Sequence, residues 1–203
     1  MERTAALQRK QSSTAVWVTY ILIAINLMVY LLQQLLPNYL VISSLLYNPL
    51  YVEFTGQWWR ALTAGFVHDQ TNLTHLLLNM FSLWLFGRAI EPALGKIKYL
   101  LVYLLSILGG SAGVWLIGLV TADLNVNTVG ASGGIFGLFG AFFILTKLRG
   151  ADMTPIVILI AINLIYGFIV PGISWQAHLG GLLTGLFVTW LLQKAGLRNN
   201  KQG

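Results

Sequence analysis

The sequence predicts an all-α integral membrane protein that crosses the bilayer six times. Of its 203 residues, 57% are hydrophobic and only 9% are charged, whereas a soluble domain carries about 25% charged residues. The apolar residues gather in runs, and a transmembrane helix needs ~20 such residues. We therefore expect a single polytopic membrane domain over residues 1–203, in which six apolar runs form a helical bundle.

Charged and turn-forming residues separate the six runs. Their approximate bounds are 15–36, 73–90, 98–120, 132–147, 155–171 and 176–193. The first run is longer than the apolar core of a signal peptide, and no small-residue cleavage site follows it, so we expect it to be retained. The segment 37–72 is long and rich in aromatic residues, which favours a large, membrane-embedded first loop.

The basic residues predict the orientation of the bundle. If the N-terminus is cytoplasmic, 11 of the 12 basic residues lie on the cytoplasmic side and only Arg60 lies outside. The eleven are Arg3, Arg9, Lys10, Arg88, Lys96, Lys98, Lys147, Arg149, Lys194, Arg198 and Lys201. This asymmetry predicts that both termini are cytoplasmic, in the cell membrane. Because the basic residues are scattered between spans, we expect contact with membrane lipid and no nucleic-acid partner.

The sequence lacks residues that several kinds of chemistry require. There is no cysteine, which excludes disulfides, thiol nucleophiles and Cys-based metal centres. No Asp lies inside a span, and no H-E-x-x-H motif occurs, which argues against aspartyl and zinc proteases. We expect no metal site. The two ionisable residues well inside the spans are His75 and His178, and such residues are usually functional.

Ser132 and His178 are the candidate catalytic pair. Ser132 lies in the G-A-S-G sequence at 130–133, and both residues stand at the heads of their spans. Counted from Lys147 and Lys194 at 1.5 Å per residue, they lie ~22 and ~24 Å above the inner face. A serine hydroxyl becomes nucleophilic when a neighbouring base, usually histidine, takes its proton. We predict Ser132 as nucleophile and His178 as general base, a dyad because no carboxylate lies beside His178.

Residues around this pair are assigned supporting roles. His75 and Asn79 lie four residues apart in the second span and share a helix face, and His75 lies at a similar depth, ~20 Å. With the backbone N–H of Ser132, they are candidate donors to an oxyanion.

Glycines predict how the fourth and sixth spans pack. Gly133 and Gly137 lie one turn apart in the fourth span, and Gly181 and Gly185 lie one turn apart in the sixth. Small residues let helix backbones approach closely in lipid. We therefore expect these two spans to be neighbours.

Five motifs of this sequence closely resemble those of the rhomboid family of intramembrane serine proteases. They are G-x-S-G at 130–133, A-H-x-x-G-x-x-x-G at 177–185, H-x-x-x-N at 75–79, W-R at 59–60 and G-x-x-x-E-x-x-x-G at 87–95. The resemblance implies a rhomboid-like bundle that needs no cofactor and cleaves transmembrane protein substrates in or near their membrane segments. It also implies substrate access controlled by the fifth span and the loop before the sixth. Gly130, Gly133, Gly181 and Gly185 would support the site, and Phe136 would stack on His178, where many relatives have tyrosine.

Other interpretations remain open. Ser132 could serve as a helix cap and Asn79 as an interhelical link. The chain could then be a small membrane transporter or a catalytically inactive rhomboid-like binding protein.

We further expect Trp59 and Arg60 to anchor the first loop. We expect Glu91 to pair with basic residues or backbone, and His68 to lie in the outer loop without a chemical role.

Overall fold

The computed structural model describes residues 16–199, and this part of the chain is helical apart from loops and one isolated bridge. Its long helices coincide with the predicted apolar runs. They are α2 (Trp17–Leu35), α6 (Leu73–Leu94), α7 (Lys96–Thr121), α8 (Ser132–Leu148), α9 (Thr154–Ile169) and α10 (Trp175–Asn199). By length and composition, α2, α6 and α7 could cross a membrane, and α8 and α9 are shorter apolar helices. The all-α class is confirmed for the described residues.

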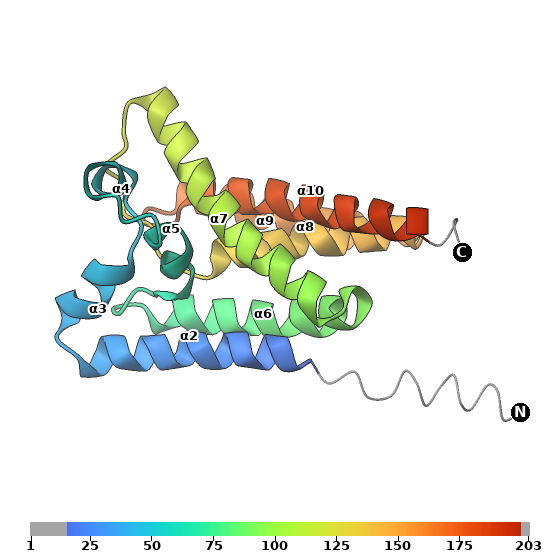
Figure 1. Cartoon of the computed structure of the whole chain (residues 1–203), viewed down its shortest axis with the longest axis horizontal. Coiled ribbons are helices and arrows are strands. Elements are labelled where there is room, and N and C mark those ends of the chain that lie inside the picture. Colours follow the sequence, from blue (N-terminus) through green and yellow to red (C-terminus); the bar gives the residue numbers. More distant parts are fainter. Residues whose placement is uncertain (1–15, 200–203) are drawn as a thin grey trace, which may run out of the picture.

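The long helices run back and forth between two ends of the molecule (Figure 1). α2 and α6 lie side by side, and α7 crosses the bundle obliquely. The beginning of α2 and the end of α10 lie at one end, and the short helices between α2 and α6 lie at the other. α6, α8 and α10 all begin near those short helices, so the first turns of these three helices lie at the same end of the bundle.

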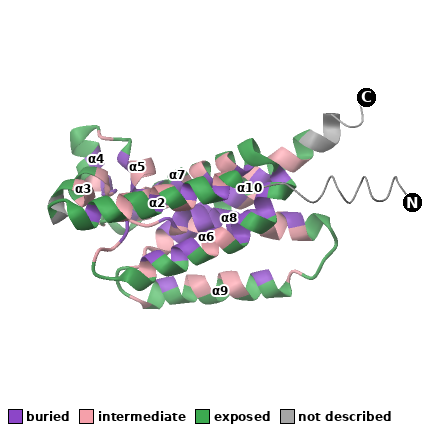
Figure 2. Cartoon of the chain, turned by 90° about the horizontal axis from the view of Figure 1, so that it is seen from below, coloured by how far each residue is buried: buried purple, intermediate pink, exposed green. Residues whose placement is uncertain are grey.

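α8 forms the centre of the bundle, whereas α9 lies at its edge. Ten of the 17 residues of α8 are buried, and α6, α7 and α10 all pack against it. In α9, by contrast, only Ile156 and Gly167 are buried among 16 residues. Figure 2 shows α9 along the margin of the molecule, largely exposed. α9 therefore packs less extensively against the rest of the bundle than the central helix does.

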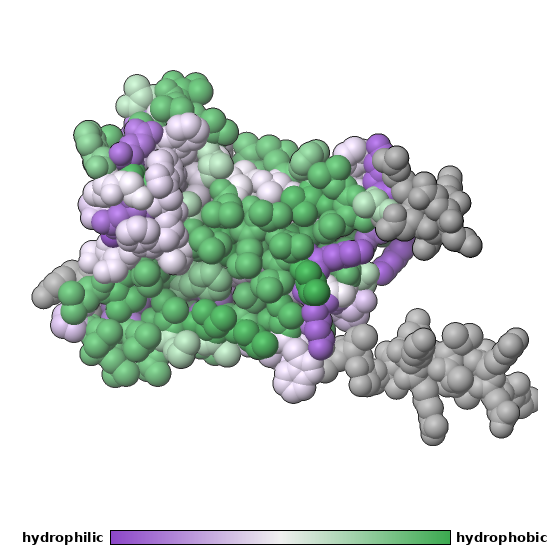
Figure 3. Space-filling view, viewed as in Figure 1, coloured by the Kyte–Doolittle hydropathy of each residue, from purple (hydrophilic) through white to green (hydrophobic). Residues whose placement is uncertain are grey.

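The outside of the bundle is apolar over much of its surface. Val120, Phe168 and Ile169 are 87%, 71% and 69% exposed, and Figure 3 shows a nearly continuous hydrophobic band across the face in view. Soluble monomers rarely expose apolar patches larger than a few hundred Å². Lipid tails would cover such a band without penalty, as expected of a membrane protein.

The start of α2 is held by the carboxylate of Glu91 on α6. Glu91 is buried, and it accepts hydrogen bonds from the backbone N–H groups of Val18 (3.0 Å) and Thr19 (2.8 Å) and from the Thr19 hydroxyl (2.7 Å). The first N–H groups of a helix have no partner within it, and a negative charge there is favourable. Of the partners expected for Glu91, the backbone is therefore the one observed.

The segment 37–72, expected as a large loop, is folded into short helices. They are α3 (Asn38–Leu45), α4 (Pro49–Thr55), α5 (Arg60–Thr63) and the 3₁₀ helix η1 (Ala64–Phe66). Asn48 caps the start of α4, since its side-chain oxygen accepts the N–H of Tyr51 at 2.9 Å, and Gly56 follows the last residue of the helix in the left-handed conformation. Elements this short contain too few turns to show a clear apolar period, which is why the sequence did not predict them.

Arg60 anchors this segment. Its side chain is buried, its Nη1 donates to the carbonyl oxygens of Ser43 (2.6 Å) and Leu46 (3.2 Å), and its Nε donates to Gln57 (2.7 Å). The anchoring role predicted for Arg60 is confirmed. Trp59 is 56% exposed and has no comparable burial.

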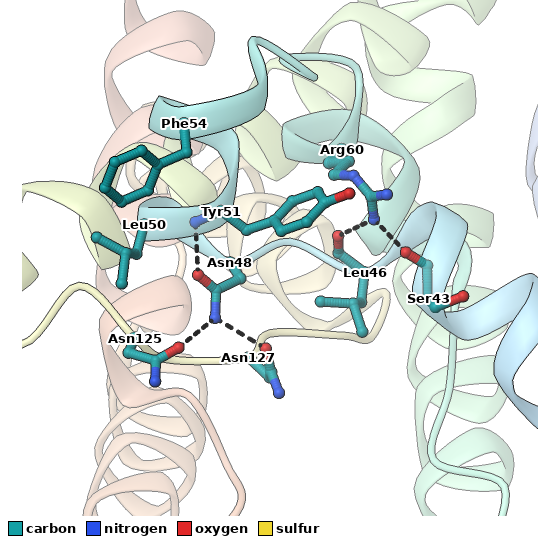
Figure 4. A pocket seen from close by; sticks show the side chains of 9 residues that line it. All are labelled: Ser43, Leu46, Asn48, Leu50, Tyr51, Phe54, Arg60, Asn125 and Asn127. Carbon is teal, nitrogen blue, oxygen red and sulfur yellow. Dashed lines mark hydrogen bonds between the residues drawn. The ribbon is translucent and has the colours of Figure 1, made fainter.

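A pocket of about 410 Å³ separates α3 and α4 from the loop before α8, and Figure 4 shows its lining. The Asn48 amide crosses its base and donates to the side chains of Asn125 (2.9 Å) and Asn127 (3.0 Å). Tyr47 and Thr128 form an antiparallel bridge beside it. The first loop and the segment that leads to Ser132 are therefore joined.

Candidate active site

Ser132 is the first residue of α8. The chain reaches it through Gly130, whose φ of 117° is accessible to glycine and rarely to other residues. The Gly130 N–H donates to the Ala64 carbonyl at 3.0 Å, which fixes this turn to η1. Because the first N–H groups of a helix lack partners inside it, the Ser132 N–H stays available, and no described hydrogen bond uses it. The Ser132 side chain is half-buried.

His178 lies in the first turn of α10 and is buried. Its ring stacks on the ring of Phe136, with 4.0 Å between the centroids and 11° between the planes. Phe136 lies one turn after Ser132 on α8, so this stack joins the two helices directly behind the serine. The stacking predicted for Phe136 is present.

Close contact between α8 and α10 is possible because both helices have glycine at the crossing. A Cβ atom on Gly181 would collide with the carbonyl oxygen of Gly133, and one on Gly185 would collide with the backbone of Gly137. Backbone cannot yield as a flexible side chain can. The glycine pairs of the two helices therefore meet as predicted, and they bring the first turns of α8 and α10 side by side.

The His178 ring is held by packing. Its Nδ1 is buried and has no hydrogen-bond partner between residues 16 and 199, so no carboxylate orients it as in a Ser-His-Asp triad. On the side of α9, a Cβ atom on Gly167 would lie 3.0 Å from Nδ1. Gly167 was not among the site residues predicted from the sequence. Its signal would have been a glycine within an otherwise bulky apolar helix.

No hydrogen bond between Ser132 and His178 is formed in the described chain, and catalytic hydrogen bonds often tighten only when substrate binds.

His75 approaches the serine from α6. A Cβ atom on Gly130 would lie 3.0 Å from both Cε1 and Nε2 of His75 and 3.7 Å from Oγ of Ser132. The imidazole and the hydroxyl therefore face the same small space beside Gly130. Asn79 lies one turn further along α6 and is buried. Its amide nitrogen donates to the His75 carbonyl at 2.9 Å, and no hydrogen bond in the described residues joins it to Ser132 or His178.

His68 lies beside this cluster and is fully buried. Its ring centroid is 5.4 Å from that of His75, with 56° between the planes. Burial and, to a smaller extent, the neighbouring His75 lower the pKa of His68 to about 4, and the Phe66 carbonyl opposes the shift. The position in the loop before α6 was expected, but the burial against His75 was not.

The chain is similar to proteins of one known family. The Rhomboid domain profile matches residues 55–195. The rhomboid protein YdcA of Bacillus subtilis is 39% identical over 141 residues, which cover 67% of this chain and 68% of YdcA. Rhomboid protease GluP of the same bacterium is 32% identical over 191 residues, which cover 88% of this chain and 36% of GluP.

A plant relative extends the same pattern. The mitochondrial RHOMBOID-like protein 6 of Arabidopsis thaliana is 36% identical over 141 residues, which cover 66% of this chain and 43% of that protein. The chain therefore spans about two thirds of YdcA and less than half of GluP and of the plant protein. Residues 55–195 contain Ser132, His178, His75 and Asn79, so the profile covers every candidate site residue.

Proposed function

The chain belongs to the rhomboid family, and from this premise we propose that it is an intramembrane serine endopeptidase with Ser132 as nucleophile and His178 as general base. One observation carries the proposal. The first turns of α8 and α10 are pressed together by glycines, and His178 lies flat on Phe136 one turn behind Ser132. This arrangement supports the pairing of the Ser132 hydroxyl with the His178 imidazole inside an apolar bundle.

In the proposed reaction, Oγ of Ser132 attacks the carbonyl carbon of the scissile peptide bond while the neutral His178 takes its proton. The tetrahedral intermediate collapses when His178 gives that proton to the leaving amine. The resulting acyl-enzyme ester is hydrolysed by water, which His178 activates in the same way, and Ser132 is regenerated. Because no carboxylate among residues 16–199 bonds to His178, its orientation would depend on the Phe136 stack and on α9.

The oxyanion of the intermediate needs fixed hydrogen-bond donors. The Ser132 N–H at the start of α8 is the first, and His75, across Gly130 from the serine hydroxyl, is the second. Asn79 is the third, because a carboxamide has two N–H groups and its bond to the His75 carbonyl uses one.

Substrate access is proposed to run past α9. The grooves on either side of this helix are apolar, one of about 270 Å³ between α6, α8 and α9 and one of about 290 Å³ between α8, α9 and α10. Their lining suits a transmembrane segment, so the substrates would be membrane proteins cut in or near such a segment. We propose six spans with both termini in the cytoplasm, in the cell membrane.

The rival functions are a small membrane transporter and an inactive rhomboid-like binding protein. The test is labelling of the purified protein with a fluorophosphonate, together with cleavage of a single-span substrate in liposomes. Wild type should be labelled and should cleave. Ser132→Ala should lose both activities, and His178→Ala should lose cleavage, while both variants stay folded. Ser44→Ala, which changes an exposed serine of the first loop, is the matched control and should behave as wild type.

Labelling that persists in Ser132→Ala would rule out this nucleophile. A folded wild-type protein that is neither labelled nor active would favour the binding protein or the transporter.

A further inference from the structure

The segment that precedes α6 is fastened to the end of α2 by Gln33. The Gln33 side chain is buried, its Nε2 donates to the His68 carbonyl at 2.7 Å, and its Oε1 accepts the His68 N–H at 3.1 Å. One carboxamide thus satisfies both backbone groups of one residue. The Gln70 side chain adds a bond to the Gln33 carbonyl at 2.5 Å. The backbone position of His68 is therefore fixed by α2 and not by α6.

The His68 side chain passes this constraint on to His75. Neither of its ring nitrogens makes a well-aligned hydrogen bond within residues 16–199. The Phe66 carbonyl lies close enough to raise the pKa of His68. Its defined contact is the tilted packing on the His75 ring. The His68 ring therefore acts through its packing against the His75 ring.

His75 needs a packing partner for its ring because it lies in the first turn of α6. It is the third residue of α6, in a first turn whose N–H groups lack partners inside the helix. The residues immediately before it, from Thr71 to Thr74, are exposed. Asn72 caps the His75 N–H through its side chain at 3.3 Å, which fixes the backbone but not the ring. The His75 ring also lies against Gly130, which has no side chain to hold it.

We propose that Gln33 is a positioning residue for the active site. By fixing the backbone of His68, it holds the His68 ring against the His75 ring and so keeps His75 directed at the space beside Ser132. This inference rests on the proposed function, in which His75 helps to stabilise the oxyanion. It assigns to the first long helix a part in catalysis that does not involve contact with substrate.

The test compares Gln33→Leu, which removes both hydrogen bonds and keeps similar bulk, with Gln34→Ala as the matched control on the next residue. kcat and KM for a single-span substrate are measured in liposomes. Gln33→Leu should lower kcat roughly tenfold and leave KM within about twofold, because transition-state donors affect kcat. Gln34→Ala should match wild type, since the Gln34 side chain is exposed and its bond to the Gln70 carbonyl is long, 3.4 Å.

A double-mutant cycle separates positioning from general destabilisation. In a His75→Ala background, Gln33→Leu should cause no further loss of kcat, because the residue that it positions is gone. His68→Phe, which keeps a flat ring, should retain more of the kcat than His68→Ala. An equal loss from Gln33→Leu in both backgrounds, or a change in KM alone, would overturn the proposal.

A chemical readout keeps the test independent of protease activity. Diethyl pyrocarbonate modifies accessible imidazoles, and mass spectrometry reports the rate at each histidine. Gln33→Leu should speed modification of His75, and Gln34→Ala should not. An unchanged rate would refute the positioning role. If wild type shows no Ser132-dependent cleavage, the proposed function fails, whereas the modification rates still decide whether Gln33 fixes His75.

Discussion

At the scale of single residues, the Phe136–His178 stack makes the identity of residue 136 testable. Phe136→Leu keeps an apolar side chain but removes the flat surface, so the His178 ring would lose its defined plane. We expect kcat to fall about tenfold, which is less than the ~10²–10⁴-fold that a general base contributes, because His178 itself is kept. Phe136→Tyr keeps the ring and should retain most of the activity. Cleavage assays on the two variants, with circular dichroism to check folding, measure the difference.

If Phe136→Leu were as active as Phe136→Tyr, the stack would not orient His178. The orientation of the imidazole would then have to come from α9 and Gly167.

The lowered pKa of His68 predicts that the stability of the folded protein depends on pH. Its pKa is about 4 in the folded protein and near 6.5 in an unfolded chain. As pH falls below about 6.5, the unfolded chain takes up a proton at this residue and the folded protein does not, so folding becomes less favourable. The stabilisation is complete above the unfolded pKa, and up to roughly 3 kcal/mol of it is lost between about pH 6.5 and 4.

The measurement is the free energy of unfolding in mild detergent from pH 7 to 4, for wild type and His68→Phe. The variant should lose less stability over this range, and the difference isolates His68 from its neighbours His75 and Asp69. The hydrogen bonds from Thr71 lower the pKa of Asp69, which places its titration below this window. Parallel curves for the two proteins would contradict the prediction.

At the scale of helices, the glycine crossing of α8 and α10 gives the sharpest prediction. Gly181→Ala places a methyl group against the Gly133 carbonyl, which cannot move without shifting α8. The two helices must separate, and the distance from Ser132 to His178 must grow. We expect loss of fluorophosphonate labelling together with a lower unfolding temperature. Leu183→Ala, a change at an exposed position of the same helix, should leave labelling intact.

The same helices show what could be predicted from the sequence. The long apolar runs predicted the six long helices, because a run of that length has few other structures available in lipid. The glycine spacing predicted the α8–α10 contact, because only small residues allow it. The short helices of segment 37–72 and the burial of His68 depend on contacts with Gln33 and Arg60. Such contacts join residues far apart in the chain, and no local pattern records them.

The candidate site was predicted in part for the same reason. Ser132, His178 and Phe136 stand in local motifs, so the sequence could name them. The approach of Gly167 to His178, and the path from Gln33 to His75, depend on which helices are neighbours in space. Asn79 was named from its spacing, yet its amide donates to its own helix in this structure.

At the scale of the whole molecule, the proposed orientation can be tested because the chain has no cysteine. Thr55→Cys lies in α4 and Ala151→Cys in the loop between α8 and α9, both at exposed positions. In intact cells, a membrane-impermeant maleimide should label Thr55→Cys. It should label Ala151→Cys only after the membrane is permeabilised. The reverse pattern would invert the topology, and equal labelling of both would exclude a membrane between these two ends of the molecule.

The joint between the first loop and the segment leading to Ser132 has a consequence for mutational studies. Its Tyr47–Thr128 bridge and its Gly130-to-Ala64 bond are made by main-chain atoms. Because every amino acid except proline supplies the same N–H and C=O, replacing Tyr47 or Thr128 by alanine would leave the main-chain groups of the bridge in place. Gly130 is the exception, since its φ of 117° disfavours alanine. Part of what steadies the nucleophile on this side is therefore hidden from side-chain substitutions, whereas the bonds from Asn48 to Asn125 and Asn127 are not.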